Sequence, residues 1–298
     1  MMPRFLAALA LACLLLPGAA SGLTVTDQTG RRVILPRPPG RIVSLVPSVT
    51  EAVFTIGAQD RLVGVTDFCD YPAEARRKPS VGGMISPSLE GIVALKPDLV
   101  VATTAGNRHE TFDQLARLKI PVYLVNPVAV SDVLDLIGRL GRLTDRPEPA
   151  GRLVVALRER IQAVVARVAG RPRPRVLYVL WPDPLIVPAR GALVSELLGL
   201  AGGDSVTADG GQGYPRYSME AALARNPEVI LVARHDPTGS PLARSTWERF
   251  TQVPAVSAGR LHTVDGDLMH RYGPRVVDGL EALARLIHPG AFEKAARR

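Results

Sequence analysis

The chain has 298 residues, of which 47% are hydrophobic, 21% charged and only 5% aromatic. This composition suits one large or two modest globular domains, and it excludes a disordered protein. The formal net charge is +8, but the basic residues gather in turns, a linker and the tail without interleaved aromatics. We therefore interpret the charge as a solvated surface and not as a nucleic-acid site.

The N-terminal segment predicts export. Arg4 is the only charged residue before Asp27, and an apolar run over residues 5–16 leads into a region of small residues. This pattern is typical of a secretory signal peptide, and the run is shorter than the roughly 20 residues of a membrane span. We expect a signal peptide over residues 1–21. A lipoprotein signal centred on Cys13 is the weaker alternative, because the apolar core continues past that cysteine.

Once the signal is removed, Cys69 is the only cysteine left in the chain. An exported protein with a single thiol has no internal disulfide, so its fold must depend on a hydrophobic core.

Residues 22–146 predict an α/β lobe, because apolar strand-like runs alternate with helical patterns. The expected strands and helices are, in chain order, a strand at 41–46, a helix ending at Gly57, a strand at 62–65, a strand at about 99–102, a helix at 111–118, a strand at 122–125 and a helix at 130–144. Such alternation is typical of a parallel sheet with helices on both faces.

Residues 147–170 predict one long helix that interrupts this alternation. Pro147 and Pro149 suit a helix start, and apolar residues then recur at helical spacing as far as Val168. The alternation restarts in residues 171–298, with strands expected at 175–180 and 261–264 and helices at about 193–200 and 274–286. Two lobes joined by a helix place a binding cleft between them.

Residues 88–102 and 218–232 look like two copies of one structural unit. In each copy a serine, a glutamate two residues later and a proline seven residues after that precede an apolar run. We expect a short helix that ends before the proline and leads into a buried strand. The serine is placed to cap the helix, and Glu90 and Glu220 lie in the first turn.

Several segments together resemble a known family. They are Arg41-Ile42-Val43-Ser44-Leu45-Val46-Pro47-Ser48-Val49-Thr50-Glu51, Val63-Gly64-Val65-Thr66-Asp67, Asp70-Tyr71-Pro72, and the stretch from Leu89 to Val100. They resemble the helical-backbone class of periplasmic substrate-binding proteins of ABC importers for cobalamin, haem and iron-siderophores, the cobalamin-binding members most. The resemblance implies two Rossmann-like lobes with parallel sheets bridged by a single long helix. It also implies a periplasmic monomer that holds its ligand between the lobes with little movement and delivers it to a permease in the inner membrane.

The same resemblance assigns roles to individual residues. Glu90 and Glu220 match two lobe-tip glutamates that dock on arginines of the permease, although each could simply stabilise its helix N-terminus. The residues that match ligand-binding positions are the aromatics Phe68, Trp181 and Tyr214 and the polar pair Asp267 and Arg271. An ordinary core role is the alternative for Phe68 and Trp181. Two further aromatic positions of the cobalamin-binding pattern are Met84 and Thr103 here, which leaves the choice among cobalamin, haem and siderophore open.

Direct metal capture is not expected, because the five histidines include no close pair. Cys69, Met269 and His270 are expected in loops that face the cleft, where any of them could ligate cobalt or haem iron, or merely fill space. A siderophore would favour Arg216, Arg234 and Arg271 in the cleft.

An exported enzyme is the alternative from another class. The glycine-rich stretches do not follow a strand and open a helix in the phosphate-binding manner, and no G-x-S-x-G motif is present. We therefore expect binding without catalysis, no catalytic residue and no resident cofactor.

Overall fold

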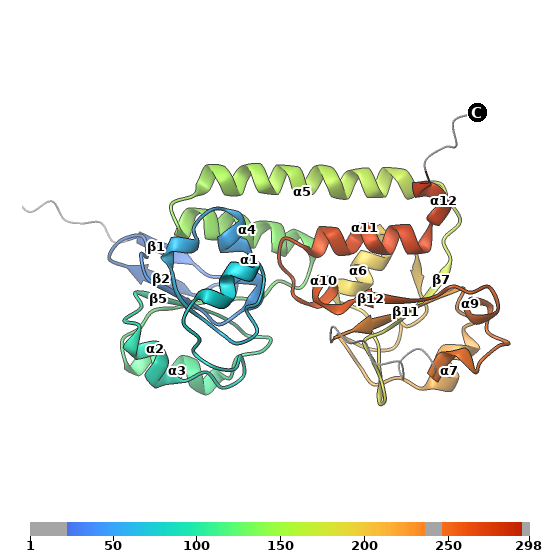
Figure 1. Cartoon of the computed structure of the whole chain (residues 1–298), viewed down its shortest axis with the longest axis horizontal. Coiled ribbons are helices and arrows are strands. Elements are labelled where there is room, and N and C mark those ends of the chain that lie inside the picture. Colours follow the sequence, from blue (N-terminus) through green and yellow to red (C-terminus); the bar gives the residue numbers. More distant parts are fainter. Residues whose placement is uncertain (1–22, 236–245, 294–298) are drawn as a thin grey trace, which may run out of the picture.

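The computed structural model describes residues 23–235 and 246–293, which form two α/β lobes beside one long helix (Figure 1). This helix is α5 (Pro147–Val168), and it extends along one side of the molecule over both lobes. Each lobe contains a four-stranded parallel sheet. The predicted fold, two lobes with parallel sheets bridged by a single long helix, is confirmed.

The sheet of the first lobe has the spatial order β4-β3-β5-β6. Its strands are β3 (Ile42–Ser44), β4 (Leu62–Val65), β5 (Leu99–Thr103) and β6 (Val122–Val125). All five residues of β5 are buried, as expected for a strand covered on both faces. The helices are α1 (Pro47–Thr55), α2 (Leu89–Ala94), α3 (His109–Arg117) and α4 (Val130–Leu143), with short 3₁₀ turns η1 (Gln59–Arg61) and η2 (Ala73–Arg77).

The second lobe is built in the same way, with the spatial order β10-β7-β11-β12. Its strands are β7 (Arg175–Val179), β10 (Asp204–Ser205), β11 (Val229–Arg234) and β12 (Leu261–Asp265), and β8 (Trp181–Pro182) pairs with β9 (Leu185–Ile186) beside them. The described helices are α6 (Leu193–Leu200), α7 (Met219–Ala224), α9 (Pro254–Ser257), α10 (Gly266–His270), α11 (Val276–Ile287) and α12 (Pro289–Phe292).

The repeat seen in the sequence is a repeat in three dimensions. In both sheets the strands lie in the order second, first, third, fourth along the chain, and α2 and α7 both precede the third strand. Ser88 and Ser218 cap these helices by accepting hydrogen bonds from the backbone N–H groups of Gly91 and Ala221, at 3.0 and 3.1 Å.

An unpredicted pair of arginines extends this repeat. Arg41 and Arg175 stand at the start of the first strand of their lobes, and each guanidinium donates to backbone carbonyl groups just past the short helix. The backbone N–H of each arginine in turn donates to the acidic residue at the start of the third strand, Asp98 or Glu228, at 2.9 Å. The same polar contacts therefore hold α2 and α7 in equivalent positions.

The two lobes share one hydrophobic core beneath α5. Ala150, Leu157, Val164 and Val168 recur every seven or four residues, and they are the buried stripe of the helix. They belong to a continuous cluster that also contains Leu136 of α4, Leu197 of α6 and Leu280 of α11. The lobes are thus joined by packed helices as well as by the chain itself, which restricts their relative movement.

Three local features differ from the sequence predictions. The strand expected at residues 41–46 ends at Ser44, because the side chain of Ser44 exchanges hydrogen bonds with the backbone of Val46 and turns the chain toward α1. A hairpin of β1 (Leu23–Thr26) and β2 (Arg32–Leu35) precedes the first sheet and was not predicted. The segment after β12, expected to be a loop, begins with the helix α10.

Candidate functional site

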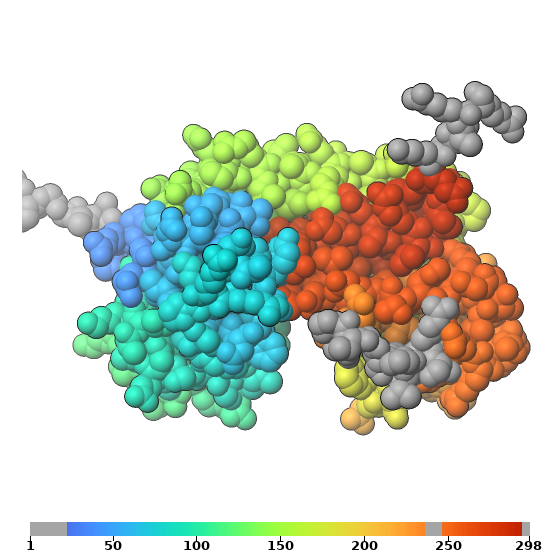
Figure 2. All heavy atoms as spheres, in the orientation of Figure 1, coloured from blue at the N-terminus to red at the C-terminus, as the bar shows by residue number. Residues whose placement is uncertain are grey.

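The loops at the carboxyl ends of both sheets meet at the base of a cleft between the lobes. Ser48 follows β3 and packs closely against Gly273 of the second lobe. A Cβ atom added to Gly273 would lie only 3.2 Å from the Ser48 Cα. Arg271, which follows β12 and α10, forms an ion pair with Asp70 in the loop after β4. Figure 2 shows the cleft as a notch between the lobes, open on the side away from α5. Ligands of open parallel sheets bind at the carboxyl ends of their strands, so this cleft is the candidate site.

The first lobe contributes exposed aromatic side chains from the loop after β4. Phe68 is 58% exposed and Tyr71 is 44% exposed. Phe68 lies two residues before Asp70, which contacts the opposite lobe. The alternative that Phe68 is an ordinary core residue is therefore wrong, because the loop turns its ring to the solvent.

The second lobe contributes a row of aromatic and imidazole rings. Trp181 follows β7 and is 49% exposed, so the core alternative is also wrong for this residue. Its ring centroid lies 6.0 Å from that of His235, which in turn lies 5.7 Å from His270. Tyr178 and Tyr214 each lie 5.8 Å from His270, edge to face. These five residues are named here the ring cluster, and they come from the ends of β7, β11 and α10, from β8 and from the loop before α7.

Hydrogen bonds fix the orientation of the ring cluster. The Tyr178 hydroxyl and His270 Nε2 are 2.9 Å apart, and the hydroxyls of Tyr214 and Tyr272 are 2.6 Å apart. Burial lowers the pKa of His270 to about 3, with a smaller contribution from His235, so the imidazole is neutral at physiological pH. Burial raises the pKa of Tyr178, Tyr214 and Tyr272. Tyr178, Tyr214, Tyr272 and His270 therefore form an uncharged, preorganised wall.

The predicted polar pair lies at the base of the cleft. Arg271 Nη2 is 2.8 Å from Asp267 Oδ2, and the same guanidinium pairs with Asp70 of the first lobe. Burial opposes the charge of Arg271, but its bonds to these carboxylates outweigh that effect and raise its pKa. The Arg271 side chain keeps only 17% of its surface exposed, so it is placed at the floor of the cleft.

The prediction that Cys69 and Met269 face the cleft is wrong. Cys69 is 2% exposed, and its Sγ lies within 3.3 Å of the hydroxyls of Thr50 and Thr66. Met269 is fully buried, because α10 turns this position into the core against Gly279. Neither sulfur is available to a ligand in the cleft. His270 does lie in the cluster, with its Nε2 engaged by Tyr178.

The other residues considered in the sequence analysis differ in how far they are buried. Thr103 is buried, and Met84 is half-buried beside Asn107, which donates to its carbonyl oxygen at 2.6 Å. Arg216 and Arg234 are exposed, whereas Arg271 pairs with Asp70 and Asp267.

Sequence reasoning missed the roles of His235, Tyr178 and Glu51. Tyr178 and His235 stand at the carboxyl ends of β7 and β11, so their positions in a parallel sheet were the available signal. Glu51 lies in α1 and carried no such signal, because its partner Arg275 is 224 positions further along the chain.

The two predicted docking glutamates occupy equivalent exposed positions. Glu90 lies in α2 and Glu220 in α7, and these helices form the ends of the two lobes on the side away from α5 (Figure 1). The Ser218 hydroxyl donates to Glu220 Oε2 at 2.7 Å and lowers the pKa of this carboxyl group. Glu220 is therefore ionised at neutral pH.

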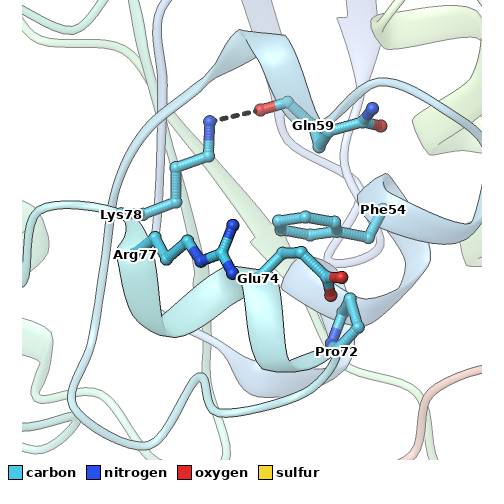
Figure 3. Close-up of a pocket in the computed structure, with 6 residues that line it drawn as sticks. All are labelled: Phe54, Gln59, Pro72, Glu74, Arg77 and Lys78. Atoms are coloured by element: carbon cyan, nitrogen blue, oxygen red, sulfur yellow. Dashed lines mark hydrogen bonds between the residues drawn. The ribbon is translucent and has the colours of Figure 1, made fainter.

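A second hollow lies on the first lobe alone. It is lined by Phe54, Gln59, Pro72, Glu74, Arg77 and Lys78. Figure 3 shows the Lys78 ammonium donating to the Gln59 carbonyl oxygen, at 2.8 Å, beside the Phe54 ring. None of these six residues belongs to the ring cluster or to the inter-lobe ion pairs, so this hollow is distinct from the cleft.

Within residues 23–235 and 246–293, no group of three or more His, Cys, Asp or Glu side chains could hold a metal ion. No helix in this same part of the chain is long and apolar enough to cross a membrane.

Comparison with known proteins identifies the family. The sequence profile of the periplasmic binding protein family matches residues 42–268. The vitamin B12-binding protein of Vibrio parahaemolyticus is 29% identical over 269 residues, which cover 90% of this chain and 93% of the relative. The vitamin B12-binding protein of Salmonella typhimurium is 32% identical over 238 residues, which cover 80% of this chain and 86% of the relative.

Solved structures agree with this family. The periplasmic vitamin B12 binding protein of Vibrio cholerae has a TM-score of 0.75 and 28% sequence identity, and the match covers 86% of this chain and 99% of that chain. A periplasmic heme-binding protein from Roseiflexus sp. RS-1 has the same TM-score with 26% identity, covering 84% and 98% of the two chains. These relatives are binding proteins and not enzymes, which agrees with the prediction of binding without catalysis. The chain belongs to the periplasmic binding protein family.

Proposed function

We propose that this protein is the substrate-binding component of an ABC importer and that it captures cobalamin, a corrinoid, between its lobes. The observation that carries the proposal is the pair of exposed aromatic side chains at the carboxyl ends of opposite sheets, Phe68 and Trp181. A large flat ligand inserted between the lobes would cover both rings, and aromatic side chains contribute much of the binding energy of such interfaces. The vitamin B12-binding relatives support this ligand over others of the class.

Polar groups at the base of the cleft would orient the ligand. Arg271 Nη2 lies 2.8 Å from Asp267 Oδ2, and the two side chains together offer a hydrogen-bond acceptor and several donors. The amide side chains of a corrinoid carry the complementary groups. Tyr214 belongs to the hydrogen-bonded wall and completes the proposed ligand set with Phe68 and Trp181.

Glu90 and Glu220 would dock the loaded protein on the permease. Both helices are capped by a serine, precede the third strand of their lobe and lie on the same side of the molecule (Figure 1). Two equal acidic contacts suit a permease with two-fold symmetry. We further propose that the mature protein acts in the periplasm as a monomer. The signal peptide predicted over residues 1–21 lies outside the described residues.

Haem is the second candidate ligand, and the imidazole of His235 favours it. His235 is exposed, and its Nε2 lies 3.0 Å from the carbonyl oxygen of Leu180. That hydrogen bond assigns the proton to Nε2 and leaves Nδ1 as the basic nitrogen, the state in which an imidazole can ligate iron. The heme-binding relatives share the fold and agree with this alternative.

Titration of the purified mature protein with cyanocobalamin, followed by calorimetry, tests the ligand. We expect saturable one-to-one binding at submicromolar concentration. Haemin is run in parallel: a Soret shift with haemin and no heat with cyanocobalamin would replace the corrinoid by haem. No response to either compound would overturn both assignments.

Uptake by cells tests the docking assignment. Replacing both Glu90 and Glu220 with Ala is expected to leave ligand affinity unchanged and to abolish uptake, because these side chains lie outside the cleft. The matched control replaces Glu148 and Glu159, two exposed carboxylates of α5, and is expected to retain uptake. Loss of affinity in the Glu90/Glu220 double variant would show that the docking assignment is wrong.

A further inference from the structure

A buried ion pair joins the lobes beneath the cleft. Arg275 Nη2 and Nε donate to the two carboxylate oxygens of Glu51, at 2.6 and 2.9 Å, in the two-pronged geometry that arginine favours. The Glu51 side chain is only 2% exposed. On the other side, the Arg275 guanidinium lies 3.7 Å from the centre of the Tyr71 ring, close enough for a cation–π contact. Arg275 is thus held by two side chains of the opposite lobe.

The backbone around this pair is also constrained. Tyr272 has a φ of 49°, a conformation that tyrosine rarely adopts. Gly273 follows, packed so closely on Ser48 and Glu51 of the first lobe that no side chain fits there without displacement. Residues 271–275 therefore follow a path that the contacts on both sides impose.

Arg271, at the edge of this segment, is shared among several carboxylates. It pairs with Asp70 across the lobes and with Asp267 within its own lobe, while Glu51 Oε1 is 3.8 Å from its Nη1. Asp70 keeps 32% of its side-chain surface exposed, in contrast to the buried Glu51. The two inter-lobe pairs therefore differ at their carboxylates: Glu51 is enclosed, whereas Asp70 is in contact with the solvent of the cleft.

We infer that Glu51 and Arg275 are positioning residues that hold the lobes and the Arg271 guanidinium in place, and that Asp70 occupies Arg271 until an acceptor oxygen of the ligand displaces it. This inference deepens the proposed function, on which its ligand step rests. The enclosed pair stays intact during binding, because breaking it would leave a buried charge without a partner. The Arg271–Asp70 pair exchanges one acceptor for another at little cost, since water can solvate the released Asp70 carboxylate.

The position of the lobes is tested without ligand. Cysteines are introduced at Ala94 and Ala224, the exposed last residues of α2 and α7, and spin labels on them report the distance between the lobe tips. Glu51→Gln is expected to broaden and lengthen the distance distribution, and Arg275→Lys, which keeps the charge but loses the two-pronged geometry, is expected to do so less. Asp70→Asn is expected to keep the wild-type distribution.

Ligand affinity, measured with cyanocobalamin, should change in opposite directions for the positioning pair and for Asp70. Glu51→Gln and Arg275→Lys are expected to weaken binding about tenfold or more, because Arg271 loses its position. Asp70→Asn is expected to strengthen binding several-fold, because Arg271 is freed from a competing carboxylate; a merely structural Asp70 would give no gain. The control is Arg160→Gln, which removes a comparable ion pair with Asp278 and Glu281 between α5 and α11, and it is expected to change neither readout.

Each result bears on one part of the inference. Wild-type distances in both Glu51→Gln and Arg275→Lys would overturn the positioning role, whatever the ligand. Unchanged or weaker binding by Asp70→Asn would overturn the exchange at Arg271. If the wild-type protein does not bind cyanocobalamin, the proposed ligand fails, while the distance measurements still decide whether Glu51 and Arg275 hold the lobes.

Discussion

Replacement of His270 by glutamine should make the protein less sensitive to acid. Burial lowers the pKa of His270 to about 3, whereas a histidine in an unfolded chain titrates near 6.5. Between these values the unfolded state binds one proton more than the native state, so stability decreases as the pH falls. One pKa unit corresponds to about 1.4 kcal/mol. This group alone therefore lowers the free energy of unfolding by about 2 kcal/mol between pH 7 and pH 5.

Urea denaturation of the wild type and of His270→Gln at pH 7, 6 and 5 measures this effect. The carboxylates titrate in both proteins and cancel in the difference. From pH 7 to pH 5, we expect the free energy of unfolding of His270→Gln to rise relative to that of the wild type by about 2 kcal/mol. Tyr178, Tyr214 and His235 surround the ring and are kept unchanged.

The control for this experiment is His109→Gln, which replaces an exposed histidine at the start of α3. Its stability should follow the wild type at each pH. If the curves of wild type and His270→Gln stay parallel from pH 7 to pH 5, then His270 is not held neutral by burial, and the uncharged wall described for the cleft is refuted.

Three further results are expected. Ser88→Ala and Ser218→Ala should each lower the free energy of unfolding by about 1 kcal/mol in urea denaturation, because each removes a helix cap, and Asp in place of Ala should restore it. Cys69 should react with a thiol reagent only after unfolding, since it is 2% exposed and burial raises its pKa; fast reaction of the native protein would contradict this. Trp181→Ala should weaken ligand binding in calorimetry without lowering the melting temperature, because the ring is 49% exposed; equal losses of both would place Trp181 in the core instead.

The spacing of residues along the chain was enough to predict the main strands and helices of both lobes and their repetition. The helix expected from Pro147 onward exists as α5, and the two serine-capped units at residues 88 and 218 lie before equivalent strands. These features depend on interactions between residues a few positions apart, such as Ser88 with Gly91, so their signals are local. The resemblance to a family then supplied the arrangement of the lobes.

The direction of side chains in irregular segments was beyond such reasoning. Cys69 and Met269 were expected in the cleft because both were assigned to loops that face it. Their actual burial depends on the turn of the loop after β4 and on the short helix α10, which no periodicity over so few residues could predict.

The sequence by itself therefore determined most strands and helices of the two sheets, the two-lobed class and the equivalent glutamates, since each depends on a local pattern or on a recognisable combination of motifs. Only the tertiary structure decided which side chains meet at the cleft. The His270 contact with Tyr178 spans 92 positions and the Arg275 contact with Glu51 spans 224. Such pairs form because two sheets and a shared core bring distant loops together. The sequence pattern around either residue does not indicate its partner.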